Sequence, residues 1–266
     1  MKFDKQLTMI FRRTVYRLSF IIGLCLLVSC GGLPIKKSDE AVSRVSLPKE
    51  GTLIYIPVQK VGAEGEVVPY QSMENPYLTQ AGQVDAAAID GFIAARRALK
   101  KKDYKKADAL LDSVVETSSD LAGPWVMKGD IALLQKRESD AATFYQNAIE
   151  ANKLNVNAYT KLAKTLRLLG KYQECLNTYV AALEVWKDFP EAHLNLAVLY
   201  DIYLNDPLLA QRHMEAYQFL TKEKDKTVAG WLEEIKSRTG AEENLVFKRE
   251  SSASQISSSE GENLGS

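Results

Sequence analysis

Residues 156–189 read VNAYTKLAKTLRLLGKYQECLNTYVAALEVWKDF, and this stretch decides the fold because its pattern recurs on both sides of it. Matching residue types fall into five columns that repeat at intervals of 34, 34 and then 35 residues. The columns are Ala107, Ala141, Cys175 and Ala210; Leu111, Tyr145, Tyr179 and Met214; Ala148, Ala182 and Tyr217; Trp125, Tyr159 and His193; and Gly129, Ala163 and Ala197. Several independent columns with one period predict an array of structural repeats.

The residue types in these columns explain why the unit repeats. Small residues in two of the columns allow two antiparallel helices to approach closely, and large residues between them fill the remaining space. One hairpin of two helices cannot bury its apolar faces alone, so neighbouring hairpins must stack. We therefore expect an all-α solenoid of helical hairpins.

The period and the columns resemble the tetratricopeptide repeat. The third unit shows this best, with Gly170-Lys171-Tyr172 at its turn, and the fourth begins with 191-EAHLNLA-197, a first helix typical of the family. The resemblance implies a repeat domain over residues 85–239, with repeats at about 88–121, 122–155, 156–189 and 190–222. The amphipathic stretch 227–238 is then the capping helix that an open solenoid end needs.

Three places depart from the family pattern. Gly91 stands where the family prefers an aromatic residue, and Lys136-Arg137-Glu138 replaces the glycine-containing turn in the second unit. The fourth unit has one extra residue near Asn205-Asp206-Pro207, where proline is acceptable at the start of a helix.

Residues 1–29 have the layout of a secretory signal peptide, with five basic residues before an apolar run of about eleven residues. That run is shorter than the roughly 20 residues that a membrane-spanning helix needs. Its end, Leu27-Val28-Ser29-Cys30, resembles the lipobox of bacterial lipoproteins, which implies that Cys30 is acylated and becomes the first mature residue. An uncleaved anchor or a simple secretory signal is the alternative. Gly31 replaces the aspartate that tends to retain such proteins in the inner membrane, which favours the outer membrane, facing the periplasm.

Two segments beside the repeats lack helical periodicity. Residues 30–84 contain five prolines and two short β-prone stretches, 53–58 and 66–70, and we expect an extended tether. Alternatively, one stretch packs against the repeats or pairs with a partner strand. We expect residues 240–266 to be disordered, because 250–266 contain seven serines and almost no bulky apolar residue.

Charge and cysteine content exclude some classes of protein. The chain of 266 residues has 34 basic and 34 acidic side chains, but without residues 1–29 the numbers are 29 and 33. This mildly acidic balance gives no reason to expect nucleic-acid binding, which needs a basic face. Cys175 is the one cysteine that falls in the expected folded part, so no intramolecular disulfide framework is expected.

Catalytic groups are scarce in the sequence, and we expect no enzyme, no cofactor and no metal. His193 occupies the aromatic column, which predicts a packing role, and with His213 it makes only a weak metal site. Cys175 lies in a small-residue column, where we expect a buried inert thiol and not a nucleophile. The sequence contains no zinc-protease motif, phosphate loop or nucleophile elbow.

The family resemblance implies a concave groove that is lined by the first helices of successive units and holds the partner. The register places Phe92, Arg96, Val126, Asp130, Leu133, Thr160, Lys161, Lys164, Arg167, Asn195, Val198 and Asp201 there. Arg96, Lys161, Lys164 and Arg167 can present a basic patch to a carboxylate or an acidic peptide, whereas a solvated charged face is the alternative. Asn195 matches an asparagine with which family members often hold the ligand backbone, and Asp201 completes the predicted site. The two-carboxylate clamp of chaperone-binding relatives is absent.

These features together predict a non-enzymatic, membrane-anchored scaffold or adaptor. It would bind proteins or peptides in the periplasm and assist the assembly of an envelope machine. The alternative is a non-catalytic binder of cell-wall glycan or a recruiter of cell-wall enzymes. Exposed aromatic residues along the groove would favour a glycan ligand, and the register places few there.

Overall fold

In the computed structural model, placement is described for residues 49–62, 65–80, 84–222 and 225–241. The predicted signal peptide, Cys30 and the segment after residue 241 lie outside the described residues. No helix among those described is long and apolar enough to cross a membrane.

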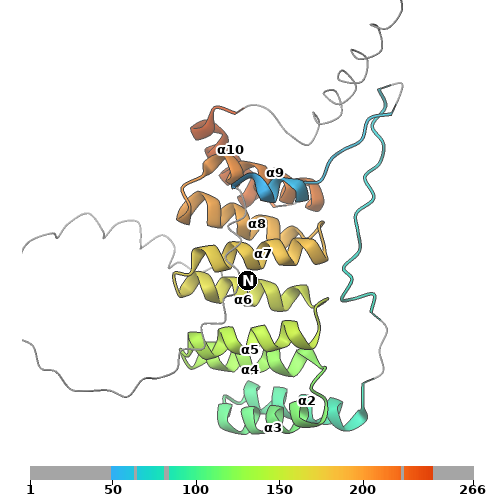
Figure 1. Ribbon diagram of the computed structural model, residues 1–266, viewed down its shortest axis with the longest axis vertical. Helices are drawn as coiled ribbons and strands as arrows, with labels where there is room; N and C mark the ends of the chain where they lie inside the picture. Colours follow the sequence, from blue (N-terminus) through green and yellow to red (C-terminus); the bar gives the residue numbers. More distant parts are fainter. Residues whose placement is uncertain (1–48, 63–64, 81–83, 223–224, 242–266) are drawn as a thin grey trace, which may run out of the picture. The chain divides into compact units, whose positions relative to one another are not determined.

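Helices pair into four hairpins that follow one another in a single row (Figure 1). The pairs are α2 (Ala86–Lys100) with α3 (Tyr104–Thr117), α4 (Ala122–Leu134) with α5 (Glu138–Ala151), α6 (Val156–Leu168) with α7 (Tyr172–Val185), and α8 (Pro190–Val198) with α9 (Pro207–Thr221). A last helix, α10 (Lys226–Thr239), packs against α9 at the end of the row. The predicted all-α solenoid of stacked hairpins is confirmed.

Short polar residues fix where many of the helices begin. Asp85, Asp103, Asn155, Asp206 and Asp225 each precede a helix, and each side chain accepts hydrogen bonds from backbone N–H groups of the first turn. These N–H groups have no partner within the helix, so the caps satisfy donors that would otherwise be left unpaired.

The turn inside each hairpin uses one left-handed residue. Lys102, Lys136, Gly170 and Asn205 have φ angles of 62°, 59°, 73° and 51°, and they repeat at the period of the sequence columns. Only Gly170 is free of the steric cost of this conformation. Lys136 therefore adopts the backbone of the glycine that it replaces, which explains how the second unit keeps its turn.

The extra residue of the fourth unit is absorbed inside a helix. The sequence places it near Asn205-Asp206-Pro207. In the structure the helix changes earlier, where α8 continues into the π-helical turn η2 (Leu199–Tyr203). A π-turn spans one more residue than an α-turn. The insertion thus leaves α9 in register with the preceding second helices.

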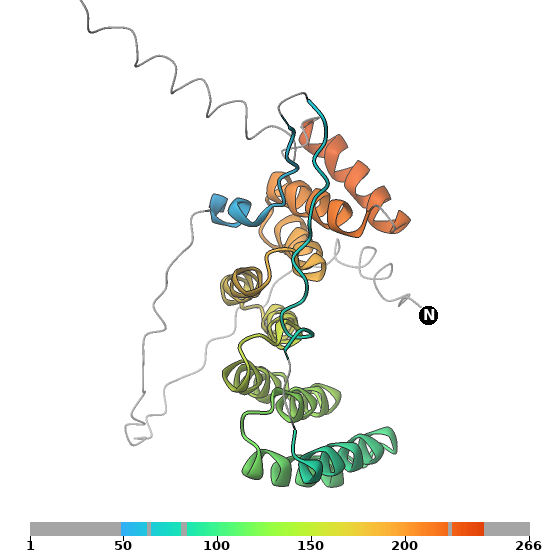
Figure 2. The same ribbon diagram turned by 90° about the vertical axis from the view of Figure 1, so that its right-hand side faces the viewer.

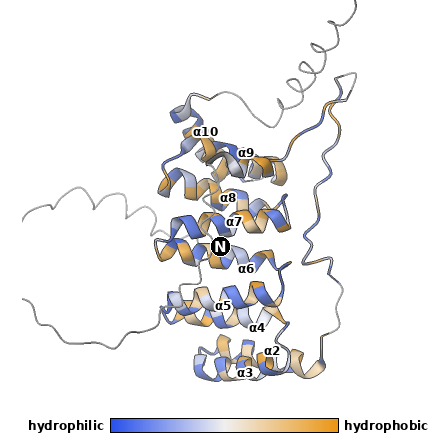
Figure 3. Cartoon of the chain, in the orientation of Figure 1, coloured by the Kyte–Doolittle hydropathy of each residue, from blue (hydrophilic) through white to orange (hydrophobic). Residues whose placement is uncertain are grey.

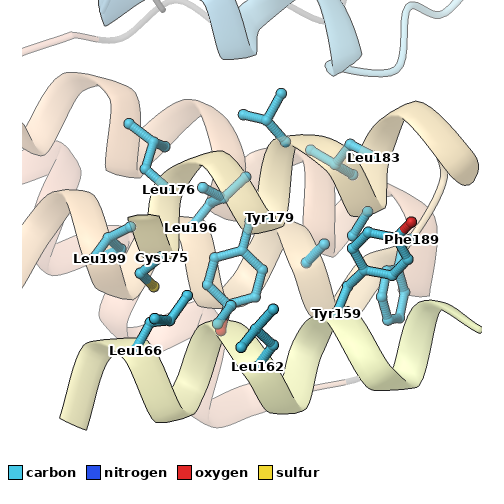
Figure 4. Packing of buried hydrophobic residues seen from close by; sticks show 14 of the residues in the cluster. Tyr159, Leu162, Leu166, Cys175, Leu176, Tyr179, Leu183, Phe189, Leu196 and Leu199 are labelled. Carbon is cyan, nitrogen blue, oxygen red and sulfur yellow. The ribbon is translucent and has the colours of Figure 1, made fainter. Parts of the chain in front are cut away.

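Buried side chains of the repeat columns form the core. Figure 4 shows Tyr179 pointing from α7 toward α6, where Leu162 and Leu166 lie. Each helix carries both polar and apolar residues, as stacking of amphipathic helices requires (Figure 3). The small-residue column is needed for close approach, because a Cβ on Gly129 would lie 2.4 Å from the Tyr145 ring. Gly91 likewise lies against Val114, where its missing Cβ would come within 2.6 Å of a methyl group.

The segment before the repeats differs from the extended tether expected over residues 30–84. Its described part, residues 49–62 and 65–80, is called the N-terminal segment below. It starts with the 3₁₀ helix η1 (Lys49–Tyr55), makes one antiparallel bridge between Val61 and Val67, and runs back along the row of hairpins (Figure 2). These residues contact the repeats, which corresponds to the alternative of a stretch packed against them and not to a free tether.

Polar contacts hold the N-terminal segment against the repeats. The buried Asp188 carboxylate, in the loop between α7 and α8, accepts hydrogen bonds from the Tyr70 hydroxyl (2.6 Å) and the Met73 N–H (2.7 Å). The indole of Trp186 donates to the Met73 carbonyl oxygen at 2.6 Å. At the other end, the hydroxyls of Thr52 and Tyr200 lie 3.1 Å apart.

Candidate functional site

An open groove of about 720 Å³ runs across the first helices of the repeats. Helices α2, α4 and α6 contribute most of its lining, α8 contributes Glu191, and the N-terminal segment contributes Tyr77. Of the twelve residues that the register places in a groove, eight line this one: Phe92, Arg96, Val126, Asp130, Leu133, Thr160, Lys161 and Lys164. The structure therefore brings most of the predicted site together, and its role in binding stays a prediction.

Asp130 is the centre of a polar network on the floor of the groove. One carboxylate oxygen accepts a hydrogen bond from the Tyr145 hydroxyl at 2.6 Å and forms an ion pair with the Lys161 ammonium at 2.7 Å. Burial, followed by the hydrogen bond to Asp130, raises the pKa of Tyr145. The charge of Lys161 is thus already balanced, which the sequence-based picture of a basic patch did not foresee.

Arg96 and Lys164 remain as uncompensated cations of the groove, because no ion pair to either occurs among the described residues. Both side chains are exposed. The pKa of Lys164 is lowered, first by partial burial of its ammonium in the groove and then by the charges of Arg167 and Lys161, while Glu191 acts in the opposite direction. Positive charge therefore accumulates at this part of the groove.

The other four residues that the register places in the groove, Arg167, Asn195, Val198 and Asp201, lie outside its lining. Arg167 stacks its guanidinium over the Tyr203 ring, 5.4 Å from the ring centroid. Asn195 donates its amide N–H to the Glu191 carbonyl oxygen at 2.6 Å, four residues earlier in the same helix. One donor of its amide is therefore used within the helix.

Asp201 requires a correction. Its side chain is only 8% exposed, and it accepts hydrogen bonds from Arg238 (2.7 Å) and from the Trp231 indole (3.1 Å), both on α10. The carboxylate therefore holds the capping helix in place and is not available to a partner. The repeat register could not show this, because α10 follows the last repeat and has no counterpart in the earlier units.

Comparison with known proteins agrees with this architecture. A family described as tetratricopeptide repeat matches residues 144–177, which run from α5 into α7. These residues match a tetratricopeptide repeat, and the folded body has the fold of a tetratricopeptide-repeat solenoid. A comparison with curated proteins gives no match.

Several solved structures share the solenoid. A tetratricopeptide-repeat protein from Parabacteroides merdae has a TM-score of 0.50 and 18% identity, over 58% of this chain and 62% of that chain. A part of MamA from Desulfovibrio magneticus RS-1 has a TM-score of 0.50 and 14% identity, over 59% and 88%. YrrB, described as a TPR protein with an unusual peptide-binding site, has a TM-score of 0.46 and 19% identity, over 56% and 76%. At such identities the likeness to the first two structures shows the fold alone.

The two histidines of the solenoid meet in its interior. His193 and His213 are both fully buried, and their Nδ1 atoms lie 3.0 Å apart. Because His193 Nε2 lies 3.0 Å from the Lys187 carbonyl oxygen, it must carry the proton, so His193 Nδ1 accepts and His213 Nδ1 donates. Burial lowers the pKa of His193 to about 4 and lowers the pKa of His213 well below its usual range, which keeps both rings neutral.

The remaining candidate groups are also buried. Cys175 is fully buried, and burial raises the pKa of its thiol to about 12, which disfavours the reactive thiolate. Within the described residues, no cluster of three or more metal-ligating side chains occurs.

Sequence reasoning missed the part that the N-terminal segment plays at the groove. Tyr77 lines the groove although it lies outside the repeats and outside their period. The prolines and the short turn-forming run Asn75-Pro76 gave the one signal, which indicated a turn but not its location against the first repeats.

Proposed function

We propose that this chain is a non-enzymatic scaffold that holds partner proteins or peptides in the groove of its tetratricopeptide-repeat solenoid. The fold supports a protein–protein interaction scaffold. The proposal further places the protein in the periplasm, anchored to the outer membrane through lipid on Cys30, where it assists the assembly of an envelope machine. The Ser29-Cys30-Gly31 sequence after an apolar run supports this part.

One observation carries the binding role. The groove keeps two exposed cations, Arg96 and Lys164, without an ion-pair partner among the described residues, whereas Lys161 beside them is neutralised by Asp130. If these cations belonged only to a solvated charged face, no hollow would be expected beside them. A hollow of about 720 Å³ is present, and both cations line it. The combination of hollow and uncompensated charge favours a ligand surface.

Burial of the candidate catalytic groups supports a role without catalysis. His193, His213 and Cys175 have no exposed surface, and the two histidines hydrogen-bond to each other. A general base or nucleophile must reach its substrate, so none of the three fits a catalytic site in this arrangement.

Polypeptide is favoured over glycan by the aromatic residues of the groove. Tyr145 and Phe189 are buried beneath its surface, and Tyr77 and Phe92 are half-buried. Stacking on a sugar ring needs an open aromatic face, which the described lining offers at few positions.

Photo-crosslinking in cells tests the binding role. A photoreactive amino acid is introduced at Arg96 or Lys164, and captured partners are identified by mass spectrometry. The matched control is Lys105, an exposed residue of α3 that does not line the groove. We expect a partner captured from both groove positions and not from Lys105. Equal capture from all three positions, or capture from none, would sink the proposal.

Changing the lipidated residue tests the anchor separately. Cys30→Ala is expected to release the protein from the membrane fraction or to leave the signal peptide uncleaved. The readout is fractionation together with the mobility of the chain on a gel. Unchanged membrane association with normal processing would show that Cys30 is not the anchor.

A further inference from the structure

A second hollow opens beside the groove, between the N-terminal segment and the first repeat. It has a volume of about 530 Å³ and shares Tyr77, Phe92 and Gly123 with the groove, so the two hollows adjoin. Its other lining side chains are mostly apolar and include Leu78, Val84, Ile89, Leu121 and Pro124.

Three of these aliphatic side chains are unusually open to solvent. Leu78 is 76% exposed, Val84 44% and Ile89 45%. Single exposed aliphatic residues are common on protein surfaces, but several around one hollow mark a contact site, because covering them removes apolar area from water.

The position of Leu78 is built by the chain and is not accidental. A turn at Asn75 holds it: the Asn75 side chain accepts a hydrogen bond from the Tyr77 N–H at 3.0 Å, and the Asn75 carbonyl accepts one from the Leu78 N–H at 3.0 Å. Gln80 then accepts a hydrogen bond from the Asn152 amide of the second repeat at 2.8 Å. The N-terminal segment therefore forms one wall of the hollow.

The hollow itself carries one carboxylate, Asp120, and the positive charge lies in the adjoining groove. Arg96 and Lys164 have no ion-pair partner among the described residues, and Arg167 and Lys161 lie close enough to influence Lys164. Asp130 is already engaged by Lys161 and Tyr145, so Glu191 is the main opposing charge in the groove.

We propose that the partner is a polypeptide segment with a bulky apolar residue that lies between Leu78 and Ile89, next to carboxylates that face Arg96 and Lys164. This inference rests on the proposed function and names the chemistry of its ligand. Going from α2 to α6 covers two helix-to-helix steps, or roughly 20 Å, which an extended chain crosses in about six residues. The apolar anchor and the carboxylates should therefore lie within one short stretch.

Selection from a displayed library of random 12-residue peptides tests this directly, with the full chain in mild detergent as the target. We expect the enriched peptides to combine at least two Asp or Glu residues with a bulky apolar residue within about six positions. Enrichment of basic or uncharged peptides, or no enrichment above a blank surface, overturns the proposal.

Variants then test each half of the surface with the best enriched peptide. Lys164→Glu and Leu78→Ser are each expected to weaken binding at least tenfold, measured by fluorescence anisotropy. The matched controls are Lys105→Glu on α3 and Leu208→Ser, where Leu208 is a 47% exposed leucine of α9 outside both hollows. Controls should bind like the unchanged chain. Unchanged affinity in Leu78→Ser, with an unchanged melting temperature, overturns the apolar half.

The outcome is distinguishable from a failure of the proposed function. Crosslinking from Arg96 and Lys164 that captures a partner, together with a library that selects no acidic peptides, overturns the ligand chemistry and leaves the scaffold role standing. A lack of both crosslinks and selected peptides overturns both.

Discussion

The repeats and the N-terminal segment are held in place by different kinds of contact. Tyr145 and Tyr179 are buried by neighbouring helices, and similar contacts recur at every hairpin, so the stability of the repeats is spread over the whole row. The N-terminal segment instead depends on a few polar contacts, chiefly those of Asp188 with Tyr70 and Met73. Loss of one buried side chain should therefore lower the free energy of unfolding of the repeats. Loss of one polar anchor should instead release the N-terminal segment and leave the repeats folded.

The largest effect is expected from a cavity in the repeats. Tyr179→Ala removes a ring that is 1% exposed and should lower the free energy of unfolding by about 3–5 kcal/mol. Urea unfolding followed by circular dichroism measures this. Tyr179→Phe is the control, because the buried Tyr179 hydroxyl finds no hydrogen-bond partner in the described part of the chain, so its removal should cost nothing or stabilise slightly. A large loss in the phenylalanine variant would contradict this account of the core.

Acid should weaken the fourth repeat, where His193 and His213 meet. Their pKa values are lowered in the fold, so below pH 6.5 the unfolded chain binds protons that the folded chain refuses. Stability is therefore complete above pH 6.5 and is lost as the pH falls toward 4. The shift of His193 alone corresponds to about 3 kcal/mol. The nearby Asp188 charge opposes the lowering of the His193 pKa but does not outweigh burial.

Urea midpoints measured at pH 7, 5.5 and 4.5 check this, with the double variant His193→Phe, His213→Leu as the reference. We expect the unchanged chain to lose more stability between pH 7 and 4.5 than the double variant does. Identical pH profiles of the two proteins would show that the buried pair does not titrate in this range.

The N-terminal segment should come loose when its anchor is removed. Asp188→Ala deletes two hydrogen bonds to a buried carboxylate, and bonds of this kind contribute roughly 1.5–3 kcal/mol each. We expect backbone hydrogen exchange to rise by about two orders of magnitude at Met73 and to stay unchanged in α4 and α5. Asp140→Ala is the control, since this carboxylate is exposed and its ion pair with Arg137 contributes little. A rise of equal size in α4 and α5 would mean that the segment and the repeats unfold together.

The smallest effect concerns the turns. Lys136 pays a steric cost at φ 59° that Gly170 avoids, so Lys136→Gly should raise stability by at most about 1 kcal/mol. A calorimetric melting temperature measures this, with Lys171→Gly, at the negative φ of the next turn, as the control. A loss of stability in Lys136→Gly equal to that of the control would show that no strain is relieved.

The sequence was sufficient for the part of the molecule that repeats. Columns such as Gly129, Ala163 and Ala197 predicted the stacked hairpins because each position occurs in the same surroundings in successive units. The register also placed Lys161 and Lys164 in the groove, since these lie at equivalent faces of first helices. The pairing of Lys161 with Asp130 escaped prediction, because it joins different helix positions in two neighbouring units.

The contacts without a period could not be predicted in this way. Asp188 lies in a loop, where an acidic residue is ordinarily solvated, and its partners Tyr70 and Met73 precede it by 118 and 115 residues. The histidine pair joins two helices of one hairpin, and only the hairpin geometry places the rings together. Asp201 was assigned to the groove because the repeat pattern contains no α10 to occupy it.

The course of the N-terminal segment has a mechanical consequence. The segment makes its first contacts with α7, η2 and α9 and lies beside α2 at Tyr77 and Leu78. Tension applied before residue 49 therefore arrives first at the contacts of η1, which include the hydroxyl contact between Thr52 and Tyr200. The contacts at Asp188 would carry the load next, and the hairpins last. The 36 residues 49–84 would then extend to at most roughly 120 Å before the first repeat carried the load. In a tethered molecule, unrolling the segment would therefore also remove the wall that Tyr77 and Leu78 form at the groove, so pulling on the chain would open the binding surface before any hairpin unfolds.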